Sequence, residues 1–319
     1  MNSSAQLRRA RRARVGLALG SGGARGWAHV GVLQALHELG IAPAAVAGTS
    51  MGALVGGVYA AGGLEGLTAL AGRIDWLDII YHFWDPSFRL SGLIDGGKVS
   101  SLIHRFVGTR RIEELAVPFA AVATDLYTGR EVRLDRGDLI EAIRASISVP
   151  ALFTPVEREG QLLVDGGLVN PVPCNVAADL GGRFIVAVEL NLRNFDSSFS
   201  RDHSRRRGRS SRRRFEPALP PGGTPLIRRA REVLAALKQA APDLPPRRQR
   251  RAAVTMVDVL GRALGVLESR VAAQQLREHP PDVLVQPDLQ DVRFLEHNRA
   301  PEIIQRGYRA TLEAFEVCT

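Results

Sequence analysis

Cysteine is scarce in this sequence: only Cys174 and Cys318 occur among its 319 residues, and they lie far apart. Two isolated cysteines match neither a disulfide framework nor the paired ligand spacing of a zinc site. We therefore expect a protein of a reducing compartment, with no metal in its site.

Long apolar runs are also missing. No stretch of about 18 uncharged apolar residues occurs, so the sequence predicts no membrane-spanning helix. A basic start followed by the apolar run 15–20 imitates a signal peptide, but that run has six residues and leads into a glycine-rich turn. We expect a cytoplasmic protein that is at most peripheral at the inner face of the membrane.

Nucleotide-binding features are absent from the glycine-rich stretch 20–26. No Lys-Ser or Lys-Thr pair follows these glycines at the spacing of a phosphate-binding P-loop. A dinucleotide-binding frame ending at Gly26 would put Ser21 in place of its first glycine, and no acidic residue ends a second strand where the ribose partner belongs. We expect no cofactor.

The chain has 45% hydrophobic and 24% charged residues, enough apolar content for a large core. Its net charge of +9 is uneven, because five arginines lie within residues 8–14 and eight within residues 201–214. Such clusters either contact an anionic membrane or form solvated, disordered arms. We do not expect nucleic-acid binding, because the second cluster is flanked by only two aromatics, Phe199 and Phe215.

Short apolar runs alternate with helical patterns up to about residue 190. Strands are expected at 15–19, 44–48, 117–124 and 184–190, with a hairpin formed by 153–156 and 161–164. Helices are expected at 27–39, 51–61 and 138–146, and residues 64–115 are mostly helical. This pattern predicts an α/β fold, a three-layer sandwich with a mainly parallel central sheet and helices on both faces.

The composition changes to Arg, Ser, Gly and Pro at 194–224, which predicts a flexible insertion. An amphipathic basic helix (226–241), a long helix (252–276), a strand (282–286) and a closing helix (301–315) are expected after it. The expected organisation is a basic tail (1–14), a catalytic core (15–193), the insertion (194–224) and a C-terminal helical part that packs on the core (225–319).

Ser50 is the candidate nucleophile, within the pattern Gly48-x-Ser50-x-Gly52. A strand precedes this serine and a helix begins after it, which is the context of a nucleophile elbow. The flanking glycines would allow a strained turn that exposes the hydroxyl. A tight turn without catalytic function remains the alternative.

The glycine-rich loop is the candidate oxyanion hole. Gly22, Gly23, Ala24 and Arg25 offer backbone N–H groups at the start of a helix, and Gly26 leaves room for close approach. The Arg25 side chain either holds a phosphoryl head group or pairs with a carboxylate of the protein.

Two kinds of general base are compatible with the sequence. An α/β-hydrolase order would make His279 or His297 the base, but that fold places several strands before its nucleophile. The alternative is Asp165, which ends an apolar strand and is followed by Gly166 and Gly167. A carboxylate there would lie at the sheet edge where α/β proteins build their sites, although an Asp-Gly pair is often only a turn.

Three motifs in this order, 22–26, 48–52 and 165–167, resemble the signature motifs of the patatin-like phospholipases. The runs 145–150 (Ala-Ser-Ile-Ser-Val-Pro), 153–155 and 165–173 are similar to the bacterial branch related to neuropathy target esterase. The resemblance covers about residues 15–190, and it does not explain the insertion at 194–224.

The resemblance implies an acyl hydrolase that uses a Ser50–Asp165 dyad without histidine or metal and acts on phospholipids or lysophospholipids. Residues 22–25 would form the oxyanion hole, and His29 would support its helix. The aromatics of residues 64–115 either line an acyl pocket or pack in the core: Trp76, Tyr81, Phe83, Trp84 and Phe88.

A different class of function is a non-enzymatic regulator that keeps the fold and binds anionic lipid through residues 201–214 and the helix at 226–241. The intact Ser50–Asp165 pair counts against it. The sequence leaves the oligomeric state and the acyl-chain and head-group preference open.

Overall fold

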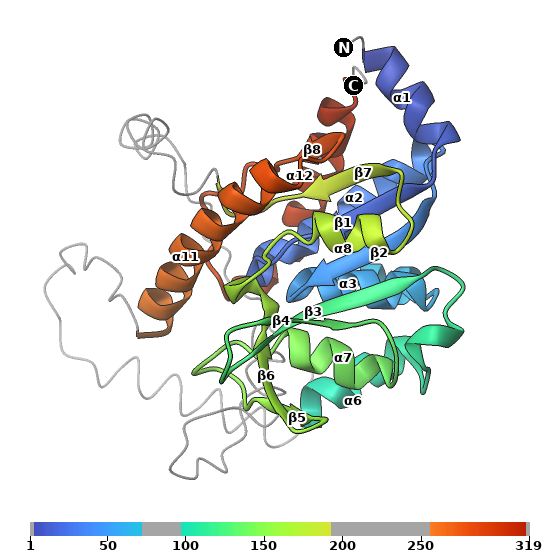
Figure 1. Ribbon diagram of the computed structural model, residues 1–319. Helices are drawn as coiled ribbons and strands as arrows, with labels where there is room; N and C mark the ends of the chain where they lie inside the picture. The colour runs from blue at the N-terminus through green and yellow to red at the C-terminus, as the bar shows by residue number, and fades with distance from the viewer. Residues whose placement is uncertain (1–2, 72–96, 193–255, 317–319) are drawn as a thin grey trace, which may run out of the picture. The chain divides into compact units, whose positions relative to one another are not determined.

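The computed structural model describes residues 3–71, 97–192 and 256–316 (Figure 1). Of these, the residues up to 192 and from 257 onward belong to one compact unit. The helices are α1 Ser3–Arg12, α2 Ala28–Glu38, α3 Met51–Ala60, α4 Leu64–Ala71, α6 Gly97–Val107, α7 Leu139–Ser146, α8 Cys174–Asp179, α11 Met256–Glu278 and α12 Ala300–Ala314. The strands are β1 Val15–Leu19, β2 Pro43–Thr49, β3 Phe119–Asp125, β4 Glu131–Leu134, β5 Val156–Arg158, β6 Gln161–Asp165, β7 Phe184–Val188 and β8 Val283–Val285.

The eight strands form one mixed sheet in the order β5-β6-β3-β2-β1-β7-β8, with β4 paired to β3. The central neighbours β3, β2, β1, β7 and β8 run parallel to one another. The pairs β3–β4, β3–β6 and β5–β6 are antiparallel. The expected mainly parallel sheet is confirmed, and the antiparallel strands gather at one end of it.

Alternate residues of the central strands face two different cores. In β1, Leu17 and Leu19 belong to the larger core while Ala18 belongs to the smaller one. The same division separates Val46 from Ala47 in β2. Successive side chains of a strand point to opposite faces, so in β1 and β2 an alanine lines one face and branched residues line the other. The alanine face leaves little space between the sheet and its covering helices.

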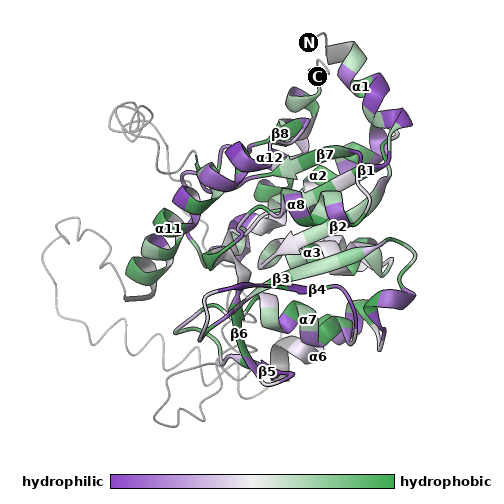
Figure 2. Cartoon of the chain, in the orientation of Figure 1, coloured by the Kyte–Doolittle hydropathy of each residue, from purple (hydrophilic) through white to green (hydrophobic). Residues whose placement is uncertain are grey.

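Helices cover both faces and complete the three layers (Figure 1). The larger core includes residues from α2, α3, α6, α7 and α12, and the smaller core includes Cys174 and Val176 of α8 and Ala272 of α11. In Figure 2, coloured by hydropathy, β1, β3 and β7 are apolar, whereas β4 and β5 are hydrophilic. The three-layer α/β sandwich predicted from the sequence is the observed architecture.

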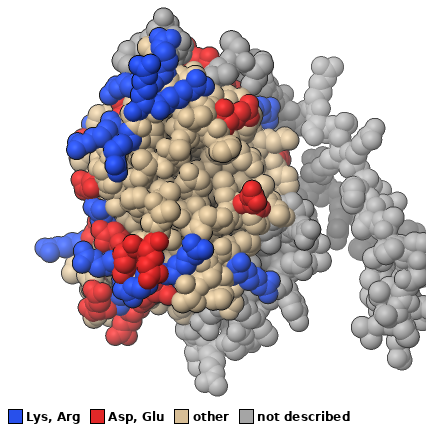
Figure 3. Space-filling model, turned by 90° about the vertical axis from the view of Figure 1, so that its right-hand side faces the viewer, with Lys and Arg blue, Asp and Glu red and all other residues tan. Residues whose placement is uncertain are grey.

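The N-terminal arginines form a helix, which corrects the disordered arm considered from composition. In α1, Gln6 donates a 2.7 Å hydrogen bond to the carbonyl of Asp282, and Arg9 pairs with the Asp282 carboxylate at 3.1 Å. Ala10 is buried against the core. Figure 3 shows basic side chains gathered at the end of the molecule where α1 lies. Specific contacts to the loop before β8 thus hold this segment.

The remaining elements follow the sequence prediction with shifts of a few residues, and β4 and α8 were missed. Both are short, and α8 begins just after Pro173. The strand expected at 282–286 is β8, which adds to the sheet beside β7. The domain boundaries drawn from composition stay a prediction. The five candidate pocket aromatics, the insertion at 194–224 and the helix at 226–241 all lie outside the described residues.

Within the described parts of the chain, no helix has both the length and the apolar character needed to cross a membrane.

Candidate active site

Ser50 occupies the sharp turn between β2 and α3. Its backbone has φ 56° and ψ −124°, a conformation that non-glycine residues rarely adopt and that stores strain. The flanking glycines are required by close approach, because a β-carbon on Gly52 would lie 2.0 Å from the Leu19 carbonyl oxygen and one on Gly48 would lie 2.4 Å from the Gly52 carbonyl oxygen. The nucleophile-elbow geometry expected from the sequence is present.

Strand pairing brings Asp165 beside Ser50. On β3, Val122 pairs with Thr49 at the end of β2, and the next residue, Ala123, pairs with Asp165 at the end of β6. The ends of β2 and β6 therefore meet along β3. The sequence argument placed Asp165 at the carboxyl end of a sheet strand; β6 is that strand, but it runs antiparallel to β3.

A direct hydrogen bond joins the two side chains. Ser50 Oγ donates to Asp165 Oδ2 at 2.6 Å, and both residues are buried. Asp165 Oδ1 accepts a second bond, 2.8 Å long, from the Gly167 amide. Burial raises the pKa of Asp165 above its ordinary value, while the bonds from Ser50 and Gly167 oppose that rise. A carboxylate with a raised pKa is a stronger base toward the serine proton.

The run 145–150 supports both members of the pair, a role that its residues did not reveal in the sequence. Ser146 Oγ accepts a 2.9 Å bond from the Ser50 amide and donates a 2.6 Å bond to the Val122 carbonyl. The Asp165 amide donates to the Ser148 carbonyl at 3.0 Å. The available signal was a pair of serines, Ser146 at the end of α7 and Ser148 just after it, shortly before Pro150.

Two of the four backbone amides that the sequence offered as oxyanion donors already bond to carbonyl groups of the protein. Residues Gly23–Trp27 form a short 3-10 helix that leads into α2. Within it, the Ala24 amide donates to the Phe294 carbonyl at 2.8 Å and the Arg25 amide donates to the Gly22 carbonyl at 3.2 Å. Both amides are bonded within the protein, and the role of residues 22–25 as oxyanion donors stays a prediction. No acceptor in the described part of the chain is bonded to the amides of Gly22 and Gly23.

The motif glycines all stand at close approaches between backbone segments or side chains. A β-carbon on any of them would come within 2.5 Å of another atom. They are Gly26, Gly48, Gly52, Gly166 and Gly167. Glycine is thus required at these positions for steric reasons. A larger residue would push apart the loops that carry Ser50 and Asp165.

None of the three histidines considered in the sequence hydrogen-bonds to Ser50. His29 contacts the Gly20 carbonyl through Nε2 at 2.8 Å and ties α2 to the end of β1. His297 Nδ1 accepts a 3.1 Å bond from Trp27 Nε1. Burial lowers the pKa of both rings to about 4, so both are neutral at physiological pH. His279, the other candidate, is exposed near the end of α11.

Arg25 is buried, and its Nε donates a 3.2 Å hydrogen bond to the Gly22 carbonyl. Burial lowers its pKa, and the nearby Glu268 and Glu189 oppose this effect. The two roles considered for Arg25 both stay predictions. Glu268, on α11, was missed by sequence reasoning because nothing marks it within a long polar helix; its Oε2 accepts a 2.9 Å bond from Ser21 Oγ.

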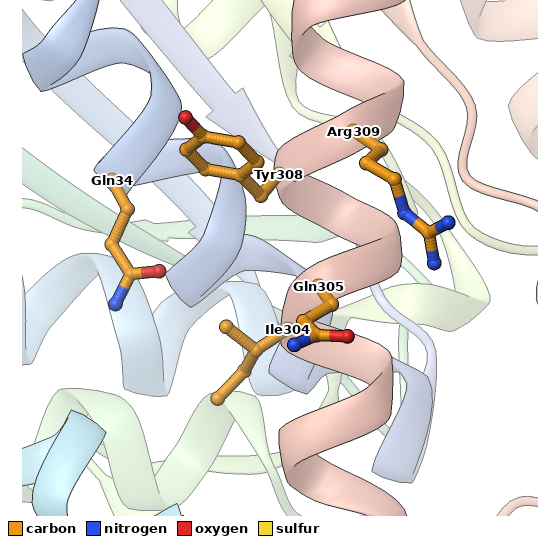
Figure 4. Close-up of a pocket in the computed structure, with 5 residues that line it drawn as sticks. All are labelled: Gln34, Ile304, Gln305, Tyr308 and Arg309. Carbon is orange, nitrogen blue, oxygen red and sulfur yellow. The ribbon is translucent and has the colours of Figure 1, made fainter. Parts of the chain in front are cut away.

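A pocket of about 360 Å³ lies elsewhere, between α2 and α12 (Figure 4). Gln34 on α2 faces Ile304 and Tyr308 on α12, and neither helix carries Ser50 or Asp165. Among the described residues, no group of three or more Asp, Glu, His or Cys side chains is placed to hold a metal ion.

Sequence comparison links these features to known proteins. Residues 17–178 match the model of the patatin-like phospholipase family. An uncharacterized NTE family protein of Mycobacterium tuberculosis is 35% identical over 95% of this chain and 92% of its own length. Patatin-like phospholipase domain-containing protein 6 of Mus musculus is 32% identical over 55% of this chain and 13% of its own length.

Among solved structures, VipD from Legionella pneumophila aligns with a TM-score of 0.46 and 14% identity, over 95% of this chain and 67% of that protein. The family match covers half of the chain and includes the glycine loop, Ser50 and Asp165. The chain therefore belongs to the patatin-like phospholipase family, a family of lipid acyl hydrolases.

Proposed function

We propose that this protein hydrolyses carboxylic esters of phospholipids or lysophospholipids through an acyl-enzyme formed on Ser50. The observation that carries the proposal is the 2.6 Å hydrogen bond from the Ser50 hydroxyl to the buried carboxylate of Asp165. A serine hydroxyl is a weak nucleophile until a neighbouring base removes its proton, and here the base is already in contact.

In the first half-reaction, Ser50 Oγ attacks the ester carbonyl carbon while its proton passes to Asp165 Oδ2. The carbonyl oxygen becomes an oxyanion, which the amides of Gly22 and Gly23 would stabilise. When the intermediate collapses, the ester C–O bond breaks, and the alcohol leaves with the proton held by Asp165.

In the second half-reaction, a water molecule gives its proton to Asp165 and attacks the acyl-enzyme. The second tetrahedral intermediate releases the fatty acid, and the proton returns from Asp165 to Ser50 Oγ. One aspartate thus acts as base and then as acid in each half, which requires a pKa closer to neutrality than that of an exposed aspartate.

A hydrolysis panel tests the proposal. Purified protein is assayed on phospholipids, lysophospholipids and short p-nitrophenyl esters, with Ser50→Ala and Asp165→Asn as inactive controls. We expect turnover of at least one lipid class that both variants lose. Wild-type activity no higher than that of Ser50→Ala on every substrate would contradict it, and liposome binding by both proteins would then favour the non-enzymatic regulator.

Contact of residues 201–214 with anionic membranes is part of this proposal. It rests on the eight arginines of that stretch. Co-sedimentation with vesicles containing anionic lipid should weaken when those arginines are replaced by serine, while hydrolysis of a short soluble ester should be unchanged.

A further inference from the structure

Glu268 on α11 reaches the start of the glycine loop. Its Oε2 accepts a 2.9 Å bond from Ser21 Oγ and a 2.8 Å bond from Asn191 Nδ2. Ser21 immediately precedes Gly22, whose backbone amide is one of the two proposed to bind the oxyanion. A residue about 90 positions beyond the family match thus holds the loop by a side-chain contact.

The other oxygen of Glu268 lies against Gly167, the glycine that also contacts Asp165. A β-carbon on Gly167 would lie 2.5 Å from Glu268 Oε1 and 3.1 Å from Asp165 Oδ1, so both oxygens pack against this one glycine. The two residues are 6% and 3% exposed. Two carboxyl groups on one glycine with so little water around them cannot both ionise without a large electrostatic cost, so the ionisation of one disfavours that of the other.

The surrounding charges decide which of the two is ionised. Asp165 accepts bonds from Ser50 Oγ and the Gly167 amide on its two oxygens, and both bonds favour a carboxylate. The bonds to Glu268 are both on Oε2, which leaves Oε1 to carry a proton. Burial raises the pKa of Glu268, and the negative charge of Asp165 raises it further.

Besides Asp165, the charged group that acts on Glu268 is Arg25 on the loop. Arg25 in turn lies within the electrostatic reach of Glu189 after β7 and Arg262 on α11. Glu189 accepts bonds from the amides of Asn191 and Leu192 and from the Gln286 side chain, the pattern of an ionised carboxylate. Burial raises the pKa of Glu189 as well, and these bonds and the charge of Arg25 oppose that rise. Glu189 therefore has more hydrogen-bond donors than Glu268 to favour its ionised form.

We propose that Glu268 is a positioning residue for the Ser50–Asp165 pair: it holds the start of the glycine loop through Ser21 and keeps a proton beside Asp165. The two carboxyl groups then carry a single negative charge, and that charge stays on Asp165, where it can accept the serine proton. This inference rests on the proposed function for its catalytic meaning, but the proton on Glu268 can be observed without any turnover.

Infrared titration of the protonated-carboxyl band tests the proton directly. The spectrum of wild type minus Glu268→Gln should contain this band at neutral pH, whereas wild type minus Glu278→Gln, an exposed glutamate on the same helix, should not. In Asp165→Asn the Glu268 band should disappear at a lower pH than in wild type, because the neighbouring charge is gone. Absence of the band at neutral pH, or an unchanged midpoint in Asp165→Asn, would overturn the proposal.

Kinetics test the positioning role. Glu268→Leu removes the acceptor for Ser21, and we expect kcat for a soluble ester to fall about tenfold. Glu268→Gln keeps an oxygen acceptor and is neutral, so it should restore most of that loss and leave the acid limb of the kcat/KM profile in place. A limb that moves to lower pH would mean that Glu268 is ionised in wild type, against the proposal.

The two arms separate the possible failures. If wild type hydrolyses no ester, the proposed function fails while the infrared titration still decides the state of Glu268. If Glu268→Leu does not fold, Glu268→Gln alone tests the proposal. Its infrared difference spectrum and the acid limb of its kcat/KM profile then report whether Glu268 is protonated in wild type.

Discussion

The two sides of the candidate site are built in different ways. Ser50 and Asp165 stand at the ends of β2 and β6, where glycines and strand register fix both side chains over short stretches of chain. Glu268 stands in the middle of α11 and reaches the site only because the helix packs across the alanine-lined face of the sheet. Local turns thus carry the groups proposed to react, and tertiary packing carries the group proposed to adjust them.

If this division is right, removing the nucleophile should have the largest effect. We expect Ser50→Ala to lower kcat by about 10⁴-fold or more, because no other group forms the acyl-enzyme. Ester turnover measured against a refolded wild-type control checks this. Residual activity within tenfold of wild type would place the nucleophile elsewhere.

Replacing the base should have the second largest effect. Asp165→Asn keeps the size of the side chain and an acceptor for the Gly167 amide but cannot accept the serine proton, and we expect kcat to fall about 10³-fold. His297→Gln is the matched control on the other candidate base, and its kcat should stay near that of wild type. A larger loss in His297→Gln than in Asp165→Asn would contradict the assignment.

The pH profile sharpens the same comparison. Burial raises the pKa of Asp165, so kcat/KM should rise with pH through a titration above the ordinary range of an aspartate. His29 and His297, whose pKa values are about 4, should not contribute to the limb. A profile measured on a soluble ester with wild type and His29→Asn should therefore overlay; a limb that disappears in His29→Asn would implicate that ring.

A smaller effect is expected from the serine that supports the elbow. Ser146→Ala leaves the buried Ser50 amide without its 2.9 Å acceptor, and we expect a loss of about 1–3 kcal/mol in stability with roughly a tenfold lower kcat. Denaturant unfolding and initial rates measure the two effects. An unchanged free energy of unfolding would show that this bond is replaced by another partner.

The smallest effect is a stability change with pH. The folded-state pKa of Asp165 lies above its ordinary value, so between these two values the unfolded chain binds fewer protons and stability falls as the pH rises. Asp165→Asn removes this ionisation. Its Tm relative to wild type should therefore be a few degrees higher at about pH 8 than at about pH 5. An offset that does not depend on pH would argue against a raised pKa.

The difference between local turns and tertiary packing also explains what could be predicted from the sequence. The elbow at Ser50 and the Asp165 turn were predictable because strand, glycine and helix signals are local, and the alternating strands and helices gave the three layers. The antiparallel direction of β6, the Ser146 contact and Glu268 depend on pairings between distant segments. The bonding of the loop amides could not be predicted for a similar reason, since Phe294, whose carbonyl accepts from the Ala24 amide, lies 270 residues away.

The most direct test of the account is the rate at which a fluorophosphonate labels the protein, followed across pH with the modified peptide identified by mass spectrometry. The account predicts a single adduct on Ser50 whose rate rises with pH through the titration of Asp165 and falls about 10³-fold in Asp165→Asn. Labelling of another residue, or equal rates in wild type and Asp165→Asn, would contradict the Ser50–Asp165 pair.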